Sequence, residues 1–337
     1  MNQSSHEDAF AKEVHRLRAD YERQRDSTNL VPPTGQRVID QDIDVVDGNA
    51  IHTYWYEDGT SKGQCIRLAD IPGTLSGDIL RLRQDLPVLK GDHEIIGDQI
   101  RPLKHAPSPP PDLEDDSEDL GPILATLPIV DVDPNLHFVK KGKYESEIRN
   151  LLKCQGGSCP GTTKSTHVVR LLGKSSDGQL VFEKFTPRWF LAFVQPFAMY
   201  KSWILQLILG MQYLHSLDIV HRDLRIDNLV FSSDKDHSRL IICDLEGRWG
   251  NRLAPEVSRE PILDAGWTKK SDIYDVSDVI KGMIYGNVPI TNLVEWPVPS
   301  PFDVVVEACT REAPEERPSL SELYDMVSNL ECNTTVG

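Results

Sequence analysis

The segment between residues 219 and 231, IVHRDLRIDNLVF, constrains this chain more than any other part of its sequence. It places apolar residues on both sides of a polar loop in which Asp223 and Asn228 lie five positions apart. An aspartate in such a loop can orient and deprotonate a hydroxyl group, and an asparagine can hold a magnesium ion. The spacing therefore favours a loop that serves phosphoryl transfer.

Two short apolar stretches after this loop predict a hairpin. Residues 230–231 and 240–243 can pair across the polar turn SSDKDHS, and the second stretch ends at Asp244. A carboxylate at the end of a strand lies at the mouth of a cleft, where it can chelate a magnesium ion that bridges phosphate oxygens. We therefore expect Asp244 to be a metal ligand.

Further motifs follow in order, so that the chain carries HRDLRIDN, DLEG, LAPE, SDIYDV and ERPS between residues 221 and 319. In this order they resemble the motifs of the eukaryotic protein kinase superfamily, and the resemblance covers about residues 120–330. The chain also looks similar to small divergent fungal kinase-like proteins. The resemblance implies an α+β, two-lobed protein-kinase-like fold, with a small β-rich lobe, a larger helical lobe and an N-terminal extension.

The resemblance also implies a role for each residue of the loop. Asp223 is expected to be the catalytic base, and Asn228 and Asp244 the metal ligands, while Arg222 braces the loop. Arg225 lies two positions after the base, where members directed at serine or threonine usually carry lysine, and it leaves the acceptor class open. Four further residues are expected to support the fold: His221, Glu256, Asp272 and Arg317. Asp272 would tie the catalytic-loop backbone to its helix, and Glu256 would pair with Arg317.

A kinase also needs a strand lysine for the phosphates and a helix glutamate that positions it. The stretch 137–154, HFVKKGKYESEIRNLLKC, supplies both residue types. Lys140 is preferred because an apolar residue precedes it, and Lys141 is the alternative register. Glu147 is preferred because a leucine follows four positions later on the same helix face, and Glu145 is the second choice.

The strand-like stretch 179–185 would lead into the hinge that binds adenine. On the resemblance, Glu183 and Phe185 belong to this hinge, and Phe182 guards the back of the nucleotide pocket. ATP and Mg²⁺ are the ligands that these residues imply.

Three departures from the superfamily change what we expect of nucleotide binding. No GxGxxG occurs in the chain, Glu246 stands where the superfamily has glycine, and only residues 248–253 separate Gly247 from Ala254. None of those six residues carries a hydroxyl, so phosphorylation cannot switch this segment. Without the glycine-rich loop, nucleotide binding should be weak or metal-dependent.

Composition and local pattern predict five parts: a helix and linker over 1–36, a β-rich extension over 37–105, a proline-rich acidic linker over 106–119, and lobes over 120–185 and 186–332. We expect the 37–105 extension to complete the small-lobe sheet, because few strands follow residue 120. The alternative is a separate partner-binding module.

The net charge of −16 argues against a nucleic-acid or membrane-surface partner, which would require a cationic face. No apolar signal region opens the chain and no apolar stretch is long enough to span a bilayer, so we expect a cytoplasmic or nuclear protein.

The favoured function is ATP- and Mg²⁺-dependent phosphotransfer to a hydroxyl, with protein serine or threonine as the first choice of acceptor. The alternatives are a pseudokinase that serves as a binding module and a kinase for a small-molecule hydroxyl. The oligomeric state stays open.

Overall fold

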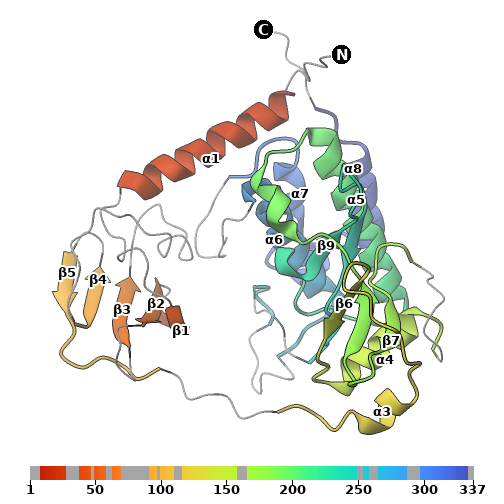
Figure 1. Ribbon diagram of the computed structural model, residues 1–337. Helices are drawn as coiled ribbons and strands as arrows, with labels where there is room; N and C mark the ends of the chain where they lie inside the picture. The colour runs from red at the N-terminus through yellow and green to blue at the C-terminus, as the bar shows by residue number, and fades with distance from the viewer. Residues whose placement is uncertain are drawn as a thin grey trace. The chain divides into compact units, whose positions relative to one another are not determined.

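The chain forms two compact units in a computed structural model (Figure 1). One unit takes in residues 1–14, 116–287 and 297–337, and the other takes in residues 15–115 and 288–296. The structure describes residues 8–27, 38–46, 49–57, 63–69, 91–96, 99–109, 116–157, 165–248, 250, 253–257, 265–286 and 297–332. Within these residues no helix combines the length and the apolar character needed to cross a membrane.

The unit formed by residues 15–115 contains one five-stranded sheet with the order β1-β2-β3-β4-β5. Its strands are β1 (Val38–Val46), β2 (Asn49–Tyr56), β3 (Gln64–Ala69), β4 (His93–Ile96) and β5 (Gln99–Pro102). Only β3 and β4 run parallel. Trp55, Ile66 and Ile95 are buried, which gives the sheet a core of its own.

The expectation that residues 37–105 complete the small-lobe sheet stays a prediction, and the strands that the structure describes in this region pair in a sheet of their own. The described strands of this region form ladders with one another, and the strands after residue 120 belong to different sheets. Alternating apolar residues predict a strand, but they do not show which sheet or which neighbouring strand it will join. The sequence pattern therefore could not decide to which sheet these strands belong.

The other unit begins with a three-stranded antiparallel sheet of order β6-β8-β7. The strands are β6 (His137–Lys140), β7 (Leu171–Lys174) and β8 (Leu180–Glu183), and two helices accompany them, α3 (Gly121–Ala125) and α4 (Glu145–Cys154). Helix α4 buries Ile148 and Leu151, as the predicted amphipathic pattern requires, and contacts β7. The strand lysine and the helix glutamate therefore lie on the predicted types of element.

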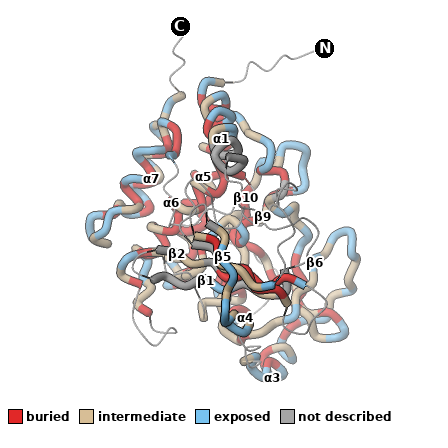
Figure 2. The backbone as a smooth tube through the Cα atoms, turned by 90° about the vertical axis from the view of Figure 1, so that its left-hand side faces the viewer, coloured by how far each residue is buried: buried red, intermediate tan, exposed pale blue. Residues whose placement is uncertain are grey.

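Helices and one hairpin follow in the part of this unit that the structure describes. They are α5 (Phe197–Ser216), α6 (Lys269–Tyr285), α7 (Asp303–Cys309) and α8 (Leu320–Ser328), the hairpin β9 (Leu229–Phe231) and β10 (Leu240–Ile242), and the 3₁₀ turns η1 (Arg188–Ala192), η2 (Ile226–Asn228) and η4 (Pro314–Glu316). Buried residues concentrate on α5, α6 and the hairpin (Figure 2). The predicted hairpin is confirmed by the β9–β10 ladder.

Two of these helices begin at capping boxes. Thr268 caps α6 with Ser271, and Ser319 caps α8 with Glu322, so backbone N–H groups at both helix starts find acceptors. Apolar residues at helical spacing form one face of α6, and its members are all buried: Ile273, Val276, Ile280 and Met283.

The start of helix α1 (Ala9–Ser27) packs against the helical part of the same unit. Asp8 accepts from the backbone N–H of Ala11 at 2.7 Å and from that of Phe197 at 2.8 Å, so one carboxylate serves both helix starts. Phe10 makes edge-to-face contacts with the rings of Phe197, Tyr200 and Phe302, at centroid distances of 5.3–5.7 Å. The aromatic contact fixes where this helix begins.

Replacing Phe10 with alanine should destabilise the protein by about 3–5 kcal/mol, because a buried aromatic side chain leaves a cavity. The exposed neighbour Lys12 is the control, and Lys12→Ala should change stability by less than about 0.5 kcal/mol. Urea unfolding followed by far-ultraviolet circular dichroism measures both. Equal midpoints for the two variants would show that the helix start contributes nothing to stability.

Candidate active site

The loop that carries HRDLRIDN is held by one buried carboxylate. Asp272 on α6 is 0% exposed, and its two oxygens accept from the backbone N–H groups of His221 and Arg222, at 2.9 Å each. The Nε2 atom of His215 lies 2.8 Å from the same carboxylate. These contacts stabilise Arg222 in a left-handed backbone conformation, with φ of 71°, which would otherwise cost energy.

Asn228 ties the end of this loop to Asp223. Its Nδ2 donates to the backbone oxygen of Asp223 at 2.7 Å and to Oδ2 of the same residue at 2.9 Å. The Nε atom of Arg225 lies 3.5 Å from that Oδ2. The orientation of the Asp223 carboxylate is therefore set by a neighbouring amide and a neighbouring cation.

The hairpin places Asp244 beside the same loop. The N–H of Cys243 donates to the carbonyl oxygen of Asn228 at 3.0 Å, and Nε2 of His221 lies 3.0 Å from the carbonyl oxygen of Cys243. Asp244 follows in a left-handed conformation with φ of 62°. Strained non-glycine residues of this kind concentrate at functional sites.

Lys140 joins its own strand to the nearby helix α4 and to the turn after β10, which is 104 residues away. Its Nζ donates to Oε1 of Glu147 on α4 at 2.9 Å and forms a short contact with Oδ1 of Asp244. Burial opposes the charge of the lysine, but the two carboxylates outweigh it and raise the pKa of Lys140 above its ordinary value. Burial also raises the pKa of Glu147, which is 2% exposed, while Lys140 lowers it.

The structure brings together Lys140 and Glu147, the preferred members of each pair of alternatives. Lys141 is exposed, and Glu145 forms its ion pair with Arg149 at 2.6 Å. The register follows from the alternation of the strand, since neighbouring side chains on β6 point to opposite faces.

Glu246 adds a third carboxylate to this cluster. Its Oε1 lies 4.0 Å from Nζ of Lys140, and oxygens of Glu147, Asp244 and Glu246 lie within 4.8 Å of one another. Burial, followed by the nearby charge of Asp244, raises the pKa of Glu246. Three carboxylates around one ammonium leave an excess of negative charge that a divalent cation can balance.

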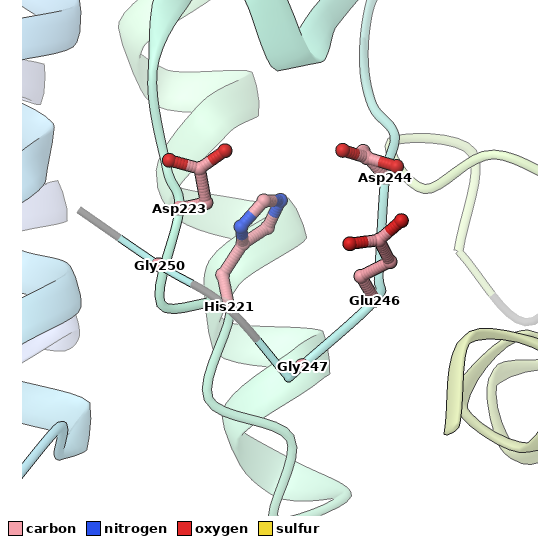
Figure 3. A pocket seen from close by; sticks show the side chains of 6 residues that line it. All are labelled: His221, Asp223, Asp244, Glu246, Gly247 and Gly250. Atoms are coloured by element: carbon pink, nitrogen blue, oxygen red, sulfur yellow. The ribbon is translucent and has the colours of Figure 1, made fainter. Parts of the chain in front are cut away.

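Asp223, Asp244 and Glu246 line a cavity of about 150 Å³, together with His221, Gly247 and Gly250 (Figure 3). In the close view Asp223 lies on one side, Asp244 and Glu246 lie on the other, and the ring of His221 lies between them. Gly250 closes the cavity, and a Cβ atom at this position would lie 2.6 Å from the carbonyl oxygen of Arg222. Only glycine allows this close approach of two backbones.

The predicted supporting residues lie around the site. Arg317 donates from both terminal nitrogens to the carboxylate of Glu256, at 2.6 and 2.8 Å, and its side chain is 0% exposed. The guanidinium of Arg222 stacks over the ring of Trp267, at 5.4 Å from the centroid. This contact joins the side chain of Arg222 to the residue before the N-cap of α6, and the bracing role of Arg222 stays a prediction.

The predicted hinge residues line a different cavity. Glu183 and Phe185 border a space of about 170 Å³ that Arg170 and Arg239 also line, whereas Phe182 is buried in β8. Their side chains and the carboxylates of the cluster therefore face separate cavities. A hinge can still bind a base through its backbone, which is why the adenine assignment stays a prediction.

Sequence reasoning missed four residues that fasten α4 to the turn after β10. Ser146 donates to the carbonyl oxygen of Glu246 at 2.5 Å, and Asn150 donates to that of Leu245 at 2.9 Å. Glu118 and Arg248 join each other at 2.5 Å. Glu118 lies in a run of acidic residues, where nothing in the sequence distinguishes it from its neighbours.

The comparisons agree with a protein-kinase-like relationship, although no family model matches the sequence. The chain is 23% identical over 159 residues to a probable serine/threonine-protein kinase of Dictyostelium discoideum, which covers 39% of this chain. It is 32% identical over 110 residues, 28% of this chain, to the serine/threonine-protein kinase ATG1b of Arabidopsis thaliana. It is 27% identical over 154 residues, 36% of this chain, to the mouse serine/threonine-protein kinase PLK2.

These similarities are weak and partial, and the chain spans only 17%, 15% and 21% of the length of these three relatives. Together with the mixed α+β fold they support a relationship to serine/threonine protein kinases. A resemblance to fungal proteins finds no support in these three relatives, which come from a slime mould, a plant and a mammal.

A partly buried aspartate on α6, near Arg225, should make stability depend on pH. Burial raises the pKa of Asp278 on α6 to about 6, although Lys281 and Arg225 lower it. Because this pKa exceeds the unfolded value of about 4, the stabilising contribution of the protonated acid is complete below about pH 4. It is lost as the pH rises through about 6.

Asp278→Asn should therefore be more stable than the wild type by roughly 1–3 kcal/mol at about pH 8, and nearly equal to it at about pH 4. Urea unfolding at both pH values measures the difference. Asp325→Asn, an exposed change on helix α8, is the control and should show no such dependence. A constant difference between Asp278→Asn and wild type at the two pH values would contradict the assignment.

Proposed function

We propose that this protein is an ATP- and Mg²⁺-dependent phosphotransferase of the protein kinase type. It would transfer the γ-phosphate to a hydroxyl group, with a protein serine or threonine as the first choice of acceptor. The observation that supports this best is the convergence of Asp223, Asn228 and Asp244 with the Lys140–Glu147 pair at one site. General kinase relationships at the sequence level point the same way.

In this proposal Asp223 is the catalytic base. The acceptor oxygen forms a bond to the γ-phosphorus while the bond between that phosphorus and the leaving oxygen of ADP breaks, and the hydroxyl proton passes to the Asp223 carboxylate. Asn228 holds that carboxylate through two hydrogen bonds from its Nδ2, so the base does not have to be oriented during the reaction.

Lys140 would bind the nucleotide phosphates. Glu147 keeps its ammonium in place at 2.9 Å and compensates for its burial. The raised pKa of Lys140 keeps it cationic at neutral pH, which phosphate binding requires. Arg225 lies beside the base and is exposed enough to meet an acceptor.

The donor set fits a magnesium ion. Asp244 supplies a carboxylate, and the Asn228 amide uses its nitrogen for its hydrogen bonds within the described residues, which leaves its oxygen for a cation. When bound, Mg²⁺ would neutralise charge on the phosphate oxygens. Glu246 provides a further carboxylate at a position where the superfamily has glycine.

A pseudokinase is the second candidate, and one feature of the site favours it. Lys140 is held by two carboxylates and has a third at 4.0 Å, so nucleotide phosphates must compete with them for the ammonium. The absence of a GxGxxG sequence removes the backbone amides that usually help. The short segment 248–253 gives little surface for a peptide acceptor, which keeps a small-molecule acceptor as a further alternative.

Asp223→Asn should lower ATP turnover by about a hundredfold or more while ATP with Mg²⁺ still raises the melting temperature. Asp244→Asn should lower turnover and also abolish the part of the thermal shift that depends on Mg²⁺. Thermal-shift titration with ATP, with and without Mg²⁺, and release of ADP measure the two effects. The exposed change Asp236→Asn is the control for both.

Background turnover in wild type equal to that of Asp223→Asn would defeat the enzymatic proposal. In that case a thermal shift with ATP in wild type would leave the pseudokinase as the better description. No shift at millimolar ATP, with or without Mg²⁺, would count strongly against catalysis.

A further inference from the structure

The last residues of the acidic linker contact the start of α4. They also contact the segment after residues 244–247, the turn that carries the proposed metal ligand Asp244 and is called the metal-binding turn below. One carboxylate oxygen of Glu118 accepts from the backbone N–H of Glu145 at 2.7 Å, at the first residue of α4. The other accepts from Nη1 of Arg248 at 2.5 Å. The N–H of Glu118 donates to the carbonyl oxygen of Lys143 at 3.0 Å, which fixes its backbone as well.

A second layer of contacts holds Arg248 and the linker in place. The guanidinium of Arg248 lies 4.7 Å from the ring centroid of Tyr144, which is 0% exposed. The hydroxyl of Tyr144 donates to Asp116 at 2.7 Å, and Nζ of Lys143 lies 2.7 Å from the other oxygen of that carboxylate. The linker residues 116–118 are therefore fastened to the residues that precede α4.

Contacts of α4 itself complete the connection to the metal-binding turn. Ser146 and Asn150 donate to the carbonyl oxygens of Glu246 and Leu245. Both flank Glu147 along the helix, so the hydrogen bonds that fix the first two turns also fix the glutamate that pairs with Lys140. Any rotation or outward shift of α4 would break several of these contacts at once.

We propose that Glu118 is a positioning residue: it clamps the start of α4 to Arg248 and thereby holds Glu147 on Lys140 without a phosphate group. The chemistry suits this role, because a carboxylate at a helix N-terminus satisfies a free N–H and interacts favourably with the helix dipole. The same carboxylate forms a charge-assisted hydrogen bond with a guanidinium. Residues 248–253 contain no hydroxyl, so a built-in carboxylate is the anion that this segment can use.

The catalytic role of the contacts that Glu118 makes with α4 and Arg248, called the clamp below, rests on the proposed function. The existence of the clamp can be tested without any assumption about catalysis. In Glu118→Gln the shape of the side chain is kept and its charge is removed. The full-length variant should exchange the amide hydrogens of residues 145–152 about three- to tenfold faster than wild type, as expected for the loss of a partly exposed charge-assisted contact. An amine-reactive probe should modify Lys140 faster by a similar factor.

The matched control is Asp119→Asn, which changes the adjacent acid. Asp119 accepts from the N–H of Gly121 at the start of α3, and within the described residues it forms no hydrogen bond or ion pair with α4 or Arg248, so its replacement should leave both rates unchanged. Glu147→Gln is the reference variant, because it gives the rate at which the probe modifies Lys140 once the Lys140–Glu147 ion pair is lost. Arg248→Gln removes the other partner of Glu118 and should raise the exchange rates to the same level, with no further rise in the double variant.

Exchange and labelling rates in Glu118→Gln equal to those in Asp119→Asn would overturn the proposal, as would additive effects of Glu118→Gln and Arg248→Gln. If wild type turns over ATP, Glu118→Gln should also lower kcat about three- to tenfold while Asp119→Asn does not. If wild type shows no turnover, the proposed function fails, and the exchange and labelling results still decide whether the clamp exists.

Discussion

The ammonium of Lys140 is the point on which the site depends. It comes from a strand, and its partners come from a helix and from the turn after a hairpin, 104 residues away in the case of Asp244. A buried ammonium needs carboxylates, and a buried glutamate needs a cation, so each group makes the burial of the other tolerable. Removing Lys140 would leave Glu147, which is 2% exposed, without its cation, and would leave the three nearby carboxylates to repel one another. The three elements are therefore held together by the same electrostatic requirement that places reactive groups at one cavity.

A second buried carboxylate holds the other half of the site. Asp272 accepts from two consecutive backbone N–H groups of the loop that precedes Asp223, and it is 0% exposed. The loop needs this support because Arg222 and Asp244 adopt left-handed backbone conformations that non-glycine residues avoid. Tertiary contacts stabilise such strain only when several of them converge, as they do here. Asp223, the proposed base, and Asp244, the proposed metal ligand, are therefore positioned by the fixed backbones of their neighbours.

Acidic residues serve several different purposes in this protein. Glu147 neutralises a lysine, Glu246 adds negative charge beside it, and Glu118 links a helix start to an arginine. The excess of acid in the composition therefore includes residues with individual structural roles. A glutamate at position 246 is also the clearest local departure from the protein kinases that the chain resembles. Its carboxylate makes the site more negative than Glu147 and Asp244 alone would, which favours the binding of a cation.

The sequence by itself determined the local features. The loop with Asp223 and Asn228, the hairpin before Asp244 and the apolar face of α6 are readable because each depends on residues close together in the chain. The sequence favoured Lys140 and Glu147 over Lys141 and Glu145, and the tertiary structure decided between these alternatives. Tertiary structure alone decided that the strands of residues 38–102 form their own sheet, and that Glu118 reaches Arg248, 130 residues away. The reason is physical: periodicity reports which face of an element is apolar, whereas packing decides what that face or its edge meets.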